Sequence, residues 1–359
     1  MKELKVNLNE HSYPIVITED FSLISKYAHN KNKCVIVADG NVEALHIVEL
    51  KEAVNKHFKE VFVYSVEPGE KSKSLDMAQR LYNFFIEHKM CRQDVVMSFG
   101  GGVIGDLAGF AAATYMRGIQ LIHVPTSLLA QVDSSIGGKT AVNLNQTKNI
   151  IGSFYQPSLV YSNYKVLKTL PKEEVKNAMV EILVHAIIKD VELFRCIEDN
   201  LDKILNLEPD IMEVLIAWNC DIKKSVIERD EKDLGERAIL NFGHTFGHAI
   251  ESAMDYKYKH GECVAIGIMG ACYISEKLGL CRDSLTIRIR NILNRIGALN
   301  NIQDCDQERV YYFLLHDKKV NCGNINFVLP IQIGEVVKHE IKDFSLITDV
   351  FEKLKNQKW

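Results

Sequence analysis

The chain has 359 residues, of which 47% are hydrophobic and 25% charged, a balance typical of soluble globular proteins. This length exceeds what one hydrophobic core usually spans, so we expect two domains. A net charge of −4 excludes a general electrostatic attraction for nucleic acid or an anionic membrane. An anion site must therefore be a local cluster, and we expect a small-molecule substrate.

The chain carries no pattern typical of export, membrane insertion or disulfide bonding. The opening MKELKVNLNE holds two lysines and two glutamates without an apolar core. Uncharged apolar stretches such as 263–274 are shorter than the ~20 residues that a membrane-spanning helix needs. Nine cysteines occur without a C-x-x-C pair, which indicates reduced thiols in the core. We therefore expect a cytoplasmic protein.

Short β-rich runs alternate with helical patterns in the first half, as in a parallel α/β sheet. Residues 5–18 predict an N-terminal hairpin, and residues 74–90 have apolar positions at helical spacing. Further strands are expected at 33–39, 61–66, 94–102 and 119–126. The pattern predicts an α/β nucleotide-binding domain over residues 1–171.

The pattern changes after Pro171, where helical periodicity continues to Trp359 with one clear strand signal at 324–330. We therefore expect a second, mostly α-helical domain over residues 172–359 that binds metal and substrate.

A glycine loop, SFGGGVIGDLAGF (98–110), follows the strand at 94–102 and opens an apolar helix. Gly100, Gly101 and Gly102 let the backbone approach a ligand, and the N–H groups of a helix start attract phosphate. A tight strand-to-helix turn would explain the glycines equally well, and the motif is not G-x-G-x-x-G.

The segment DSSIGGKT (133–140) resembles the end of a P-loop, but Asp133 stands where the first glycine is required. A flexible hinge at Gly137 and Gly138 presents Lys139, and Lys148 and Asn149 follow closely. In an acidic protein this local cluster favours an anion site over a solvated loop.

The segment NFGHTFGH (241–248) places His244 and His248 one helical turn apart on a helix predicted to begin at Asn241. The glutamate of H-E-x-x-H is missing, which argues against a zincin protease. His260 precedes a very apolar helix, and Glu181 stands alone in AMVEILVHAII, where burial would be costly without a cation. Glu181, His244 and His260 match the three-ligand set of an open zinc site, and His248 is left to bind an anion or move protons.

Several linked segments together resemble the 3-dehydroquinate synthase family. They are TYMRG (114–118), VPTSLLAQVDSSIGGKTAVN (124–143), KNIIGSFYQP (148–157), LNFGHTFGHAIE (240–251), HGECVAIGI (260–268) and HDKK (316–319). The resemblance implies a lyase that binds NAD and a divalent zinc, with cobalt as a possible substitute, and forms a homodimer. The implied reaction turns 3-deoxy-D-arabino-heptulosonate 7-phosphate into 3-dehydroquinate and phosphate in the shikimate pathway.

Carried over residue by residue, the resemblance implies roles for many side chains. The metal ligands would be Glu181, His244 and His260. NAD contacts would come from Asp39, Glu70, Lys73, Gly101, Gly102, Asp106, Thr126, Ser127, Lys139, Lys148 and Thr169. Substrate contacts would come from Asp133, Lys139, Asn149, Lys223, Arg237, Asn241, His248 and Lys318, with Arg117 reaching in from the partner subunit. Arg237 suits a carboxylate because its planar fork can bind both oxygens.

Three positions depart from the family pattern. Val184, followed by His185, stands where the family usually has a lysine, three residues after the predicted zinc glutamate. His185 points elsewhere on the helix and cannot replace that lysine. Asp233 and Ser127 replace a glutamate and a threonine.

Three rival functions stay open, and the valine favours the first of them. One is another sugar-phosphate cyclase, and a second is a metal-dependent polyol or glycerol-phosphate dehydrogenase with net redox change. The third is a metal- and nucleotide-binding protein without catalysis.

Overall fold

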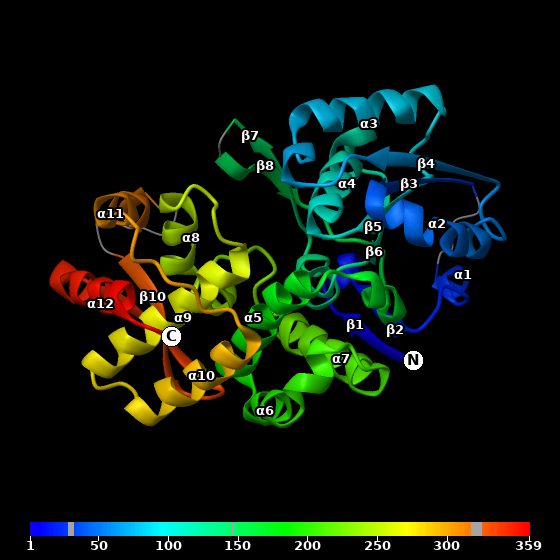
Figure 1. Cartoon of the computed structure of the whole chain (residues 1–359). Helices are drawn as coiled ribbons and strands as arrows, with labels where there is room; N and C mark the ends of the chain where they lie inside the picture. Colours follow the sequence, from blue (N-terminus) through cyan, green and yellow to red (C-terminus); the bar gives the residue numbers. More distant parts are fainter. Residues whose placement is uncertain (28–31, 146, 317–324) are drawn as a thin grey trace. The chain divides into compact units, whose positions relative to one another are not determined.

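The computed structural model describes residues 1–27, 32–145, 147–316 and 325–359, and these form two compact units. The first unit comprises Met1–Pro171 and Leu207–Lys232, and the second comprises Lys172–Asn206 and Asp233–Trp359. Figure 1 labels their helices and strands.

A seven-stranded sheet forms the centre of the first unit, with the strand order β1-β2-β9-β6-β5-β3-β4. β1 and β2 are antiparallel, and the other neighbouring strands are parallel. The strands are β1 (Lys2–Val6), β2 (Tyr13–Thr18), β3 (Lys33–Asp39), β4 (Glu60–Val66), β5 (Val95–Gly100), β6 (Gln120–Pro125) and β9 (Leu159–Asn163). The α/β prediction, its N-terminal hairpin and its four further strands are confirmed, with small shifts at their ends. The sequence pattern did not indicate β9.

Both faces of this sheet are covered, because side chains along a strand alternate between its two sides. On β3, Cys34 and Ile36 pack with Leu50 in one apolar cluster. Val35 and Val37 pack in another cluster with side chains of the helices on the opposite face. α1 (Ile24–Tyr27) and α2 (Gly40–Val54) cover the first face, and α3 (Leu75–Glu87) and α4 (Gly102–Thr114) the second.

A hairpin of β7 (Lys139–Leu144) and β8 (Thr147–Phe154) packs on α4 in the same unit. The predicted flexible hinge just before it is a turn in which Gly137 and Gly138 have φ of 96° and 68°. The Gly137 N–H donates to the Tyr13 hydroxyl over 3.1 Å. The pattern missed this hairpin because most of β8 is exposed and shows no alternation of apolar and polar positions.

Helix α7 (Pro209–Ile227) belongs to the first unit, although the sequence predicts a single boundary near Pro171. It packs against β1, β2 and a π-helical turn, Ala130–Ser134. The boundary near Pro171 coincides with one cut between the units, but Leu207–Lys232 returns to the first unit. Helical periodicity cannot reveal this return, because it is the same whichever core a helix joins.

The second unit is mostly helical. Its helices are α5 (Lys172–Lys189), α6 (Val191–Leu205), α8 (His244–Ala253), α9 (His260–Lys277), α10 (Asp283–Ile296), α11 (Gln307–His316) and α12 (Phe344–Asn356). A hairpin of β10 (Ile325–Gln332) and β11 (Glu335–Ile341) accompanies them. The predicted strand at 324–330 is confirmed over its described residues, and β11 was not predicted. Across the described ranges, no helix combines the length and apolar content needed to cross a membrane.

Candidate active site

A crevice for a nucleotide is expected where β3 and β5 end, because the chain leaves these neighbouring strands in opposite directions along the sheet. The two strand ends are close: a Cβ on Gly100 would lie 3.3 Å from the Cβ of Asp39. Asp39 accepts hydrogen bonds from the backbone N–H groups of Asn41 and Val42 and so caps α2. The glycine loop and Asp39 therefore lie together at the carboxyl edge of the sheet.

Small polar side chains lie close to the backbone at the start of α4. Gly101 is the N-cap residue, and it cannot supply a side-chain cap for the first N–H groups. A Cβ on Gly101 would lie 3.3 Å from the Ser127 hydroxyl, and a Cβ on Gly102 would lie 3.1 Å from the Ser134 hydroxyl. Thr126 is buried and donates its N–H to the carbonyl of Gly100. Backbone donors and small hydroxyl groups thus surround this helix start, as phosphate binding requires.

Lys73, Asp106 and Asn149 form a polar cluster in the first unit, in which Lys73 is buried, Asp106 is partly buried and Asn149 is exposed. The Lys73 ammonium lies 2.5 Å from the Asp106 carboxylate and 2.5 Å from the Asn149 side-chain oxygen. Burial raises the pKa of Asp106, although the neighbouring Lys73 opposes the rise. Glu70, from the same segment as Lys73, accepts a hydrogen bond from Asn143. The structure thus brings predicted NAD contacts and one predicted substrate contact together.

A second ion pair links α7 to the π-helical turn. The Lys223 ammonium donates to the Asp133 carboxylate at 2.5 Å and to the Asp133 carbonyl at 2.6 Å. Nearby, the Cys220 thiol donates to the carbonyl of Gln131. Lys223 therefore reaches the predicted anion-binding segment because α7 packs in the first unit. π-Helical turns are rare and are frequent at functional sites.

The remaining predicted residues of the first unit occupy more exposed positions. Lys139 begins β7, and Lys148 lies exposed on β8. Arg117 follows α4 with φ of 64°, a left-handed conformation that costs energy for a residue other than glycine. Thr169 lies within hydrogen-bonding distance, 2.8 Å, of the His46 ring.

In the second unit, the predicted metal ligands meet. Glu181 comes from the middle of α5, His244 is the first residue of α8 and His260 is the first residue of α9. The Nε2 atoms of both histidines lie 3.3 Å from the same oxygen, Oε1 of Glu181. Ligand atoms of His244, His248 and His260 all lie within 4.8 Å of one another. One carboxylate and three imidazoles therefore share one small volume.

Glycines let α8 and α9 approach closely enough for this meeting. A Cβ on Gly267 of α9 would lie 1.9 Å from the carbonyl oxygen of Gly243, which precedes α8. A Cβ on Gly247 of α8 would lie 3.0 Å from the Cα of Val264. Gly243 itself has φ of 79°, which favours glycine. The glycines beside the histidines thus permit backbone contact between the two helices that carry these side chains.

The prediction that this helix begins at Asn241 is wrong. α8 begins at His244, and Asn241 ends a short 3-10 helix, Glu236–Asn241. The left-handed Gly243 separates the two segments. His244 and His248 still lie one turn apart on α8, with ring centroids 5.3 Å apart.

The hydrogen bonds of the outer ring nitrogens fix how the ligand nitrogens are protonated. His244 Nδ1 lies 3.0 Å from the Phe242 carbonyl oxygen, and His260 Nδ1 lies 3.2 Å from Oε2 of Glu251. A carbonyl and a carboxylate can only accept, so each Nδ1 carries the proton. In a neutral imidazole the other nitrogen, Nε2, then has a lone pair. In this neutral form each Nε2, which lies 3.3 Å from Oε1 of Glu181, could bind a cation placed beside that carboxylate.

These residues fit a divalent cation. Although both Nε2 atoms lie near Oε1 of Glu181, this buried oxygen accepts no well-directed hydrogen bond from any residue that the structure describes. Burial alone would raise the pKa of Glu181, but His244 and His260 outweigh burial and lower it. Burial would likewise lower the pKa of His260, but Glu181 and Glu251 outweigh it and raise the pKa to about 10. The cluster strongly favours positive charge, which a proton or a metal ion can supply.

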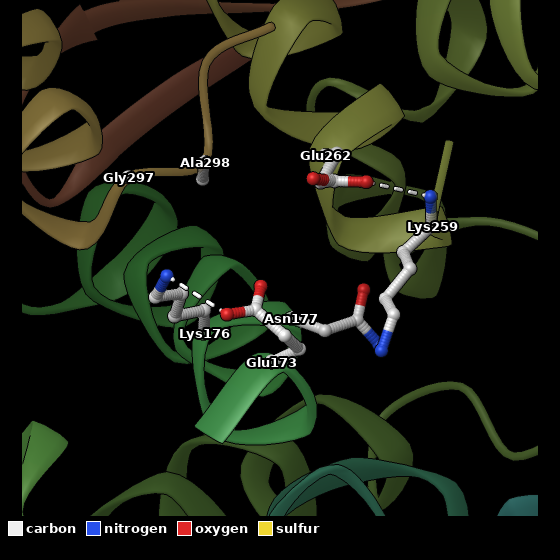
Figure 2. A pocket seen from close by; sticks show the side chains of 7 residues that line it. All are labelled: Glu173, Lys176, Asn177, Lys259, Glu262, Gly297 and Ala298. Atoms are coloured by element: carbon white, nitrogen blue, oxygen red, sulfur yellow. Dashed lines mark hydrogen bonds and ion pairs between the residues drawn. The ribbon is translucent and has the colours of Figure 1, made fainter. Parts of the chain in front are cut away.

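The start of α9 is held against α5 one turn before Glu181. The side-chain oxygen of Asn177 accepts the N–H of Gly261 at 2.5 Å. A Cβ on Gly261 would lie only 2.4 Å from the Asn177 carbonyl oxygen. Figure 2 shows Asn177 on α5 facing a small pocket with Lys259 and Glu262 on the α9 side. Asn177 therefore fixes the backbone next to His260 and lies on the helix that carries Glu181.

The other described residues that were predicted for the second unit lie outside the cluster of Glu181, His244, His248 and His260. Arg237 is buried in the 3-10 helix before α8, and Asn241 donates to the carbonyl of Ala238. Val184 and His185 are both buried on α5. Lys318 lies outside the described residues.

Sequence reasoning missed Asn177 and Glu251. Glu251 lies seven residues after His244, so helical spacing alone places both on one side of α8. An acidic residue in the apolar segment around Glu251 is the same kind of signal that indicated Glu181. Nothing in the local pattern indicates Asn177, because its partner is a backbone N–H far away in the chain.

The fold is shared with proteins of known structure. A crystal structure of 2-deoxy-scyllo-inosose synthase complexed with carbaglucose-6-phosphate, NAD⁺ and Co²⁺ superposes with a TM-score of 0.90. It is 26% identical and covers 98% of this chain and 100% of its own. An iron-containing alcohol dehydrogenase from Thermococcus thioreducens, 15% identical with a TM-score of 0.71, shares the fold alone, over 96% of this chain and 99% of its own. The chain thus shares its α/β plus helical fold with these proteins, and its own second unit holds an internal cluster of histidine and carboxylate side chains.

Sequence comparison gives the family within this class. The models described as 3-dehydroquinate synthase N-terminal and C-terminal match residues 63–177 and 178–320. The 3-dehydroquinate synthase of Ruminiclostridium cellulolyticum is 43% identical, with 98% of this chain and 99% of the relative covered. That of Acetivibrio thermocellus is 42% identical, with 99% of each covered. The chain belongs to the 3-dehydroquinate synthase family.

Proposed function

We propose that this protein converts 3-deoxy-D-arabino-heptulosonate 7-phosphate into 3-dehydroquinate and phosphate, with NAD and one divalent metal ion as cofactors. Family membership supports the reaction. The observation that carries the metal requirement is the convergence of two imidazole nitrogens on a buried carboxylate oxygen that lacks a well-directed donor among the described residues.

The proposed metal ligands are Glu181, His244 and His260. One carboxylate and two neutral imidazoles leave a divalent cation with net positive charge and open coordination positions. We propose zinc, with cobalt as a substitute. His248 shares the same volume and is assigned to the substrate, where it can bind an anion or transfer a proton.

The proposed NAD site is the crevice at the carboxyl edge of the sheet. The pyrophosphate of NAD would lie against the start of α4 at Gly101 and Gly102, where backbone N–H groups lack a side-chain cap. The other assigned contacts are Asp39, Glu70, Lys73, Asp106, Thr126, Ser127, Lys139, Lys148 and Thr169. Residues 1–171 would thus serve mainly NAD, and residues 172–359 mainly metal and substrate.

Bound NAD would take up and later return one hydride at the same carbon, while the divalent cation would acidify the sugar hydroxyl at that carbon. Oxidation leaves a ketone, which acidifies the neighbouring C–H bond. That proton passes to the departing phosphate as the C–O bond breaks. Once the ketone has been reduced again, the ring would open and an intramolecular aldol closure would form the carbocycle. No net oxidation takes place.

The chain's own residues would mainly hold the substrate in place. Arg237, buried and planar, suits the carboxylate. Lys139, Asn149, His248 and Arg117 are assigned to the phosphate, whose charge they would stabilise as it leaves. Further assigned substrate contacts are Asp133, Lys223, Asn241 and Lys318. Catalysis would then rest on positioning and charge stabilisation.

A phosphate-release assay tests this function. Purified protein is incubated with NAD and the heptulosonate phosphate, and both phosphate and NADH absorbance are followed. We expect phosphate release without NADH accumulation, loss of activity with a chelator, and recovery on adding Zn²⁺ or Co²⁺. Steady NADH accumulation without phosphate would instead indicate a dehydrogenase, and metal and NAD binding without turnover of any substrate would indicate a non-catalytic protein.

A second candidate function is cyclisation of a different sugar phosphate. Val184 favours it, because this buried apolar side chain lies one turn after Glu181 on α5, where the family usually has a lysine. The assay is therefore repeated with hexose and heptulose phosphates. Preference for the heptulosonate, measured as kcat/KM, supports the first function, and preference for a sugar without a carboxylate supports the second.

We also propose a homodimer in which Arg117 reaches the partner's substrate. Arg117 is held in a left-handed turn, and Gly118 beside it packs against Tyr155. Next to these residues in the chain, Met116 and Phe154 are 50% and 44% exposed. Large apolar side chains exposed beside a strained arginine are consistent with an interface between subunits.

A further inference from the structure

Glu251 contacts the outer nitrogen of the histidine that opens α9. Its carboxylate oxygen Oε2 lies 3.2 Å from Nδ1 of His260, and its side chain is 10% exposed. Glu251 lies on α8 three residues after His248 and seven residues after His244, on the side of the helix that carries both histidines. Nothing in the proposed reaction uses this carboxylate.

A carboxylate this deeply buried needs hydrogen-bond donors, because an ionised group loses several kcal/mol of hydration, roughly, on burial. His260 supplies one such donor through its Nδ1–H group. The same bond assigns the ring proton to Nδ1 and leaves the lone pair on Nε2, 3.3 Å from Glu181. His260 is 33% exposed, so burial alone holds its ring less firmly than that of His244 at 12%.

The two histidines are fixed in different ways. His244 donates to the carbonyl of Phe242, two residues away in the same chain segment. His260 depends on a side chain from another helix, since Glu251 is on α8 and His260 on α9. The carboxylate therefore couples the ring orientation of His260 to the packing of these two helices.

We propose that Glu251 is a positioning residue of the metal site: it holds His260 in the tautomer and ring orientation that present Nε2 to the metal. The inference rests on the proposed metal-binding function of Glu181, His244 and His260. Carboxylates that accept from a metal-bound histidine typically change metal affinity about 10- to 100-fold when removed.

The test measures Co²⁺ affinity by competition with a chelator, and the visible absorption of the bound cobalt. Glu251→Ala should weaken binding about 10- to 100-fold. Glu251→Gln retains an oxygen that accepts from Nδ1–H, so its loss should be smaller and its cobalt spectrum closer to that of the wild type. This order, wild type tighter than glutamine and glutamine tighter than alanine, is not expected from a purely structural role.

Glu262→Gln is the matched control. Glu262 lies in the first turn of α9, two residues from His260, and accepts from the Lys259 N–H and the Asn300 side chain. The glutamine can keep the cap, so cobalt affinity should equal that of the wild type. Circular dichroism establishes that each variant is folded. If Glu251→Ala does not fold, Glu251→Gln still allows cobalt affinity to be compared with that of the wild type.

A second readout is the tautomer of His260, measured by ¹H–¹⁵N correlation spectra of the zinc-loaded protein. We expect Nδ1 protonation in the wild type and a shifted Nδ1 signal in Glu251→Gln. Wild-type cobalt affinity and spectrum in both Glu251 variants would overturn this inference. Failure of the wild type itself to bind cobalt would overturn the proposed metal function instead.

Discussion

Substituting Gly267 with alanine should both destabilise the second unit and weaken metal binding. The added Cβ would lie 1.9 Å from the carbonyl oxygen of Gly243, whereas real Cβ atoms essentially never approach within 3.0 Å. The α9 backbone must therefore move away from the start of α8 by roughly 1 Å, the difference between these two distances.

The expected cost follows from two opposing effects. Forcing extra volume into a packed core costs about 1–3 kcal/mol, and more where only backbone can give way. Alanine in place of glycine within a helix stabilises the helix by about 1 kcal/mol. We expect Gly267→Ala to lower the free energy of unfolding by about 2 kcal/mol. Because His244 and His260 lie on the separated helices, a shift near 1 Å exceeds the tolerance of metal bonds, about 0.2 Å, and should weaken Co²⁺ binding at least about 10-fold.

Urea denaturation can follow the second unit alone. The chain has two tryptophans, and Trp359 belongs to the second unit, where its ring N–H donates to the carbonyl of Asn300. In a Trp218→Phe background, fluorescence therefore reports on Trp359. Gly105→Ala on α4 of the first unit is the control for a helical glycine with space around it, because a Cβ there meets nothing closer than 3.9 Å, and its stability is read from Trp218 in a Trp359→Phe background. Equal stability and cobalt affinity in Gly267→Ala and the wild type would refute the close-packing argument.

Three further predictions use single sites or pairs. His123 is fully buried beside Ser98, and burial lowers its pKa to about 4 from 6.5. The folded protein keeps this ring neutral, whereas the unfolded chain binds a proton below pH 6.5. The free energy of unfolding should therefore fall by about 3 kcal/mol as the pH drops from 6.5 to 4. In urea titrations, His123→Gln should lose less of its free energy of unfolding between pH 7 and pH 4 than the wild type does. An equal loss in both proteins would contradict this prediction. His244→Ala should abolish zinc retention and turnover in a chain that stays folded by circular dichroism, and normal zinc stoichiometry would rule out this ligand. Mixed Arg117→Ala and Lys139→Ala subunits should regain activity in hybrid dimers, and hybrid dimers without activity would count against a shared site.

Local patterns were sufficient for every strand of the large sheet except β9, and for the cluster of Glu181, His244 and His260. Buried strands such as β3 and β5 are continuous apolar runs bounded by polar residues, so their pattern survives in any tertiary context. Glu181 was recognisable because an acidic side chain in an apolar helix requires a partner, and the glycine-flanked histidines indicated the site to which it belongs.

Other features depend on contacts between distant segments, which only the folded chain reveals. Helical periodicity shows that α7 has an apolar face but cannot show that this face packs on β1 and β2. The hairpin of β7 and β8 escaped notice because its second strand is largely exposed.

The contacts around the cluster of Glu181, His244 and His260 are the clearest example. Asn177 meets the N–H of Gly261, and Glu251 meets the ring of His260, across helices that residue spacing cannot align. Residue chemistry reveals which side chains need a partner, because burial of charge has a cost at any position. The packing of the helices determines which partner each side chain meets. Glycines let the helix backbones come close together, and the packing of the whole core holds them there.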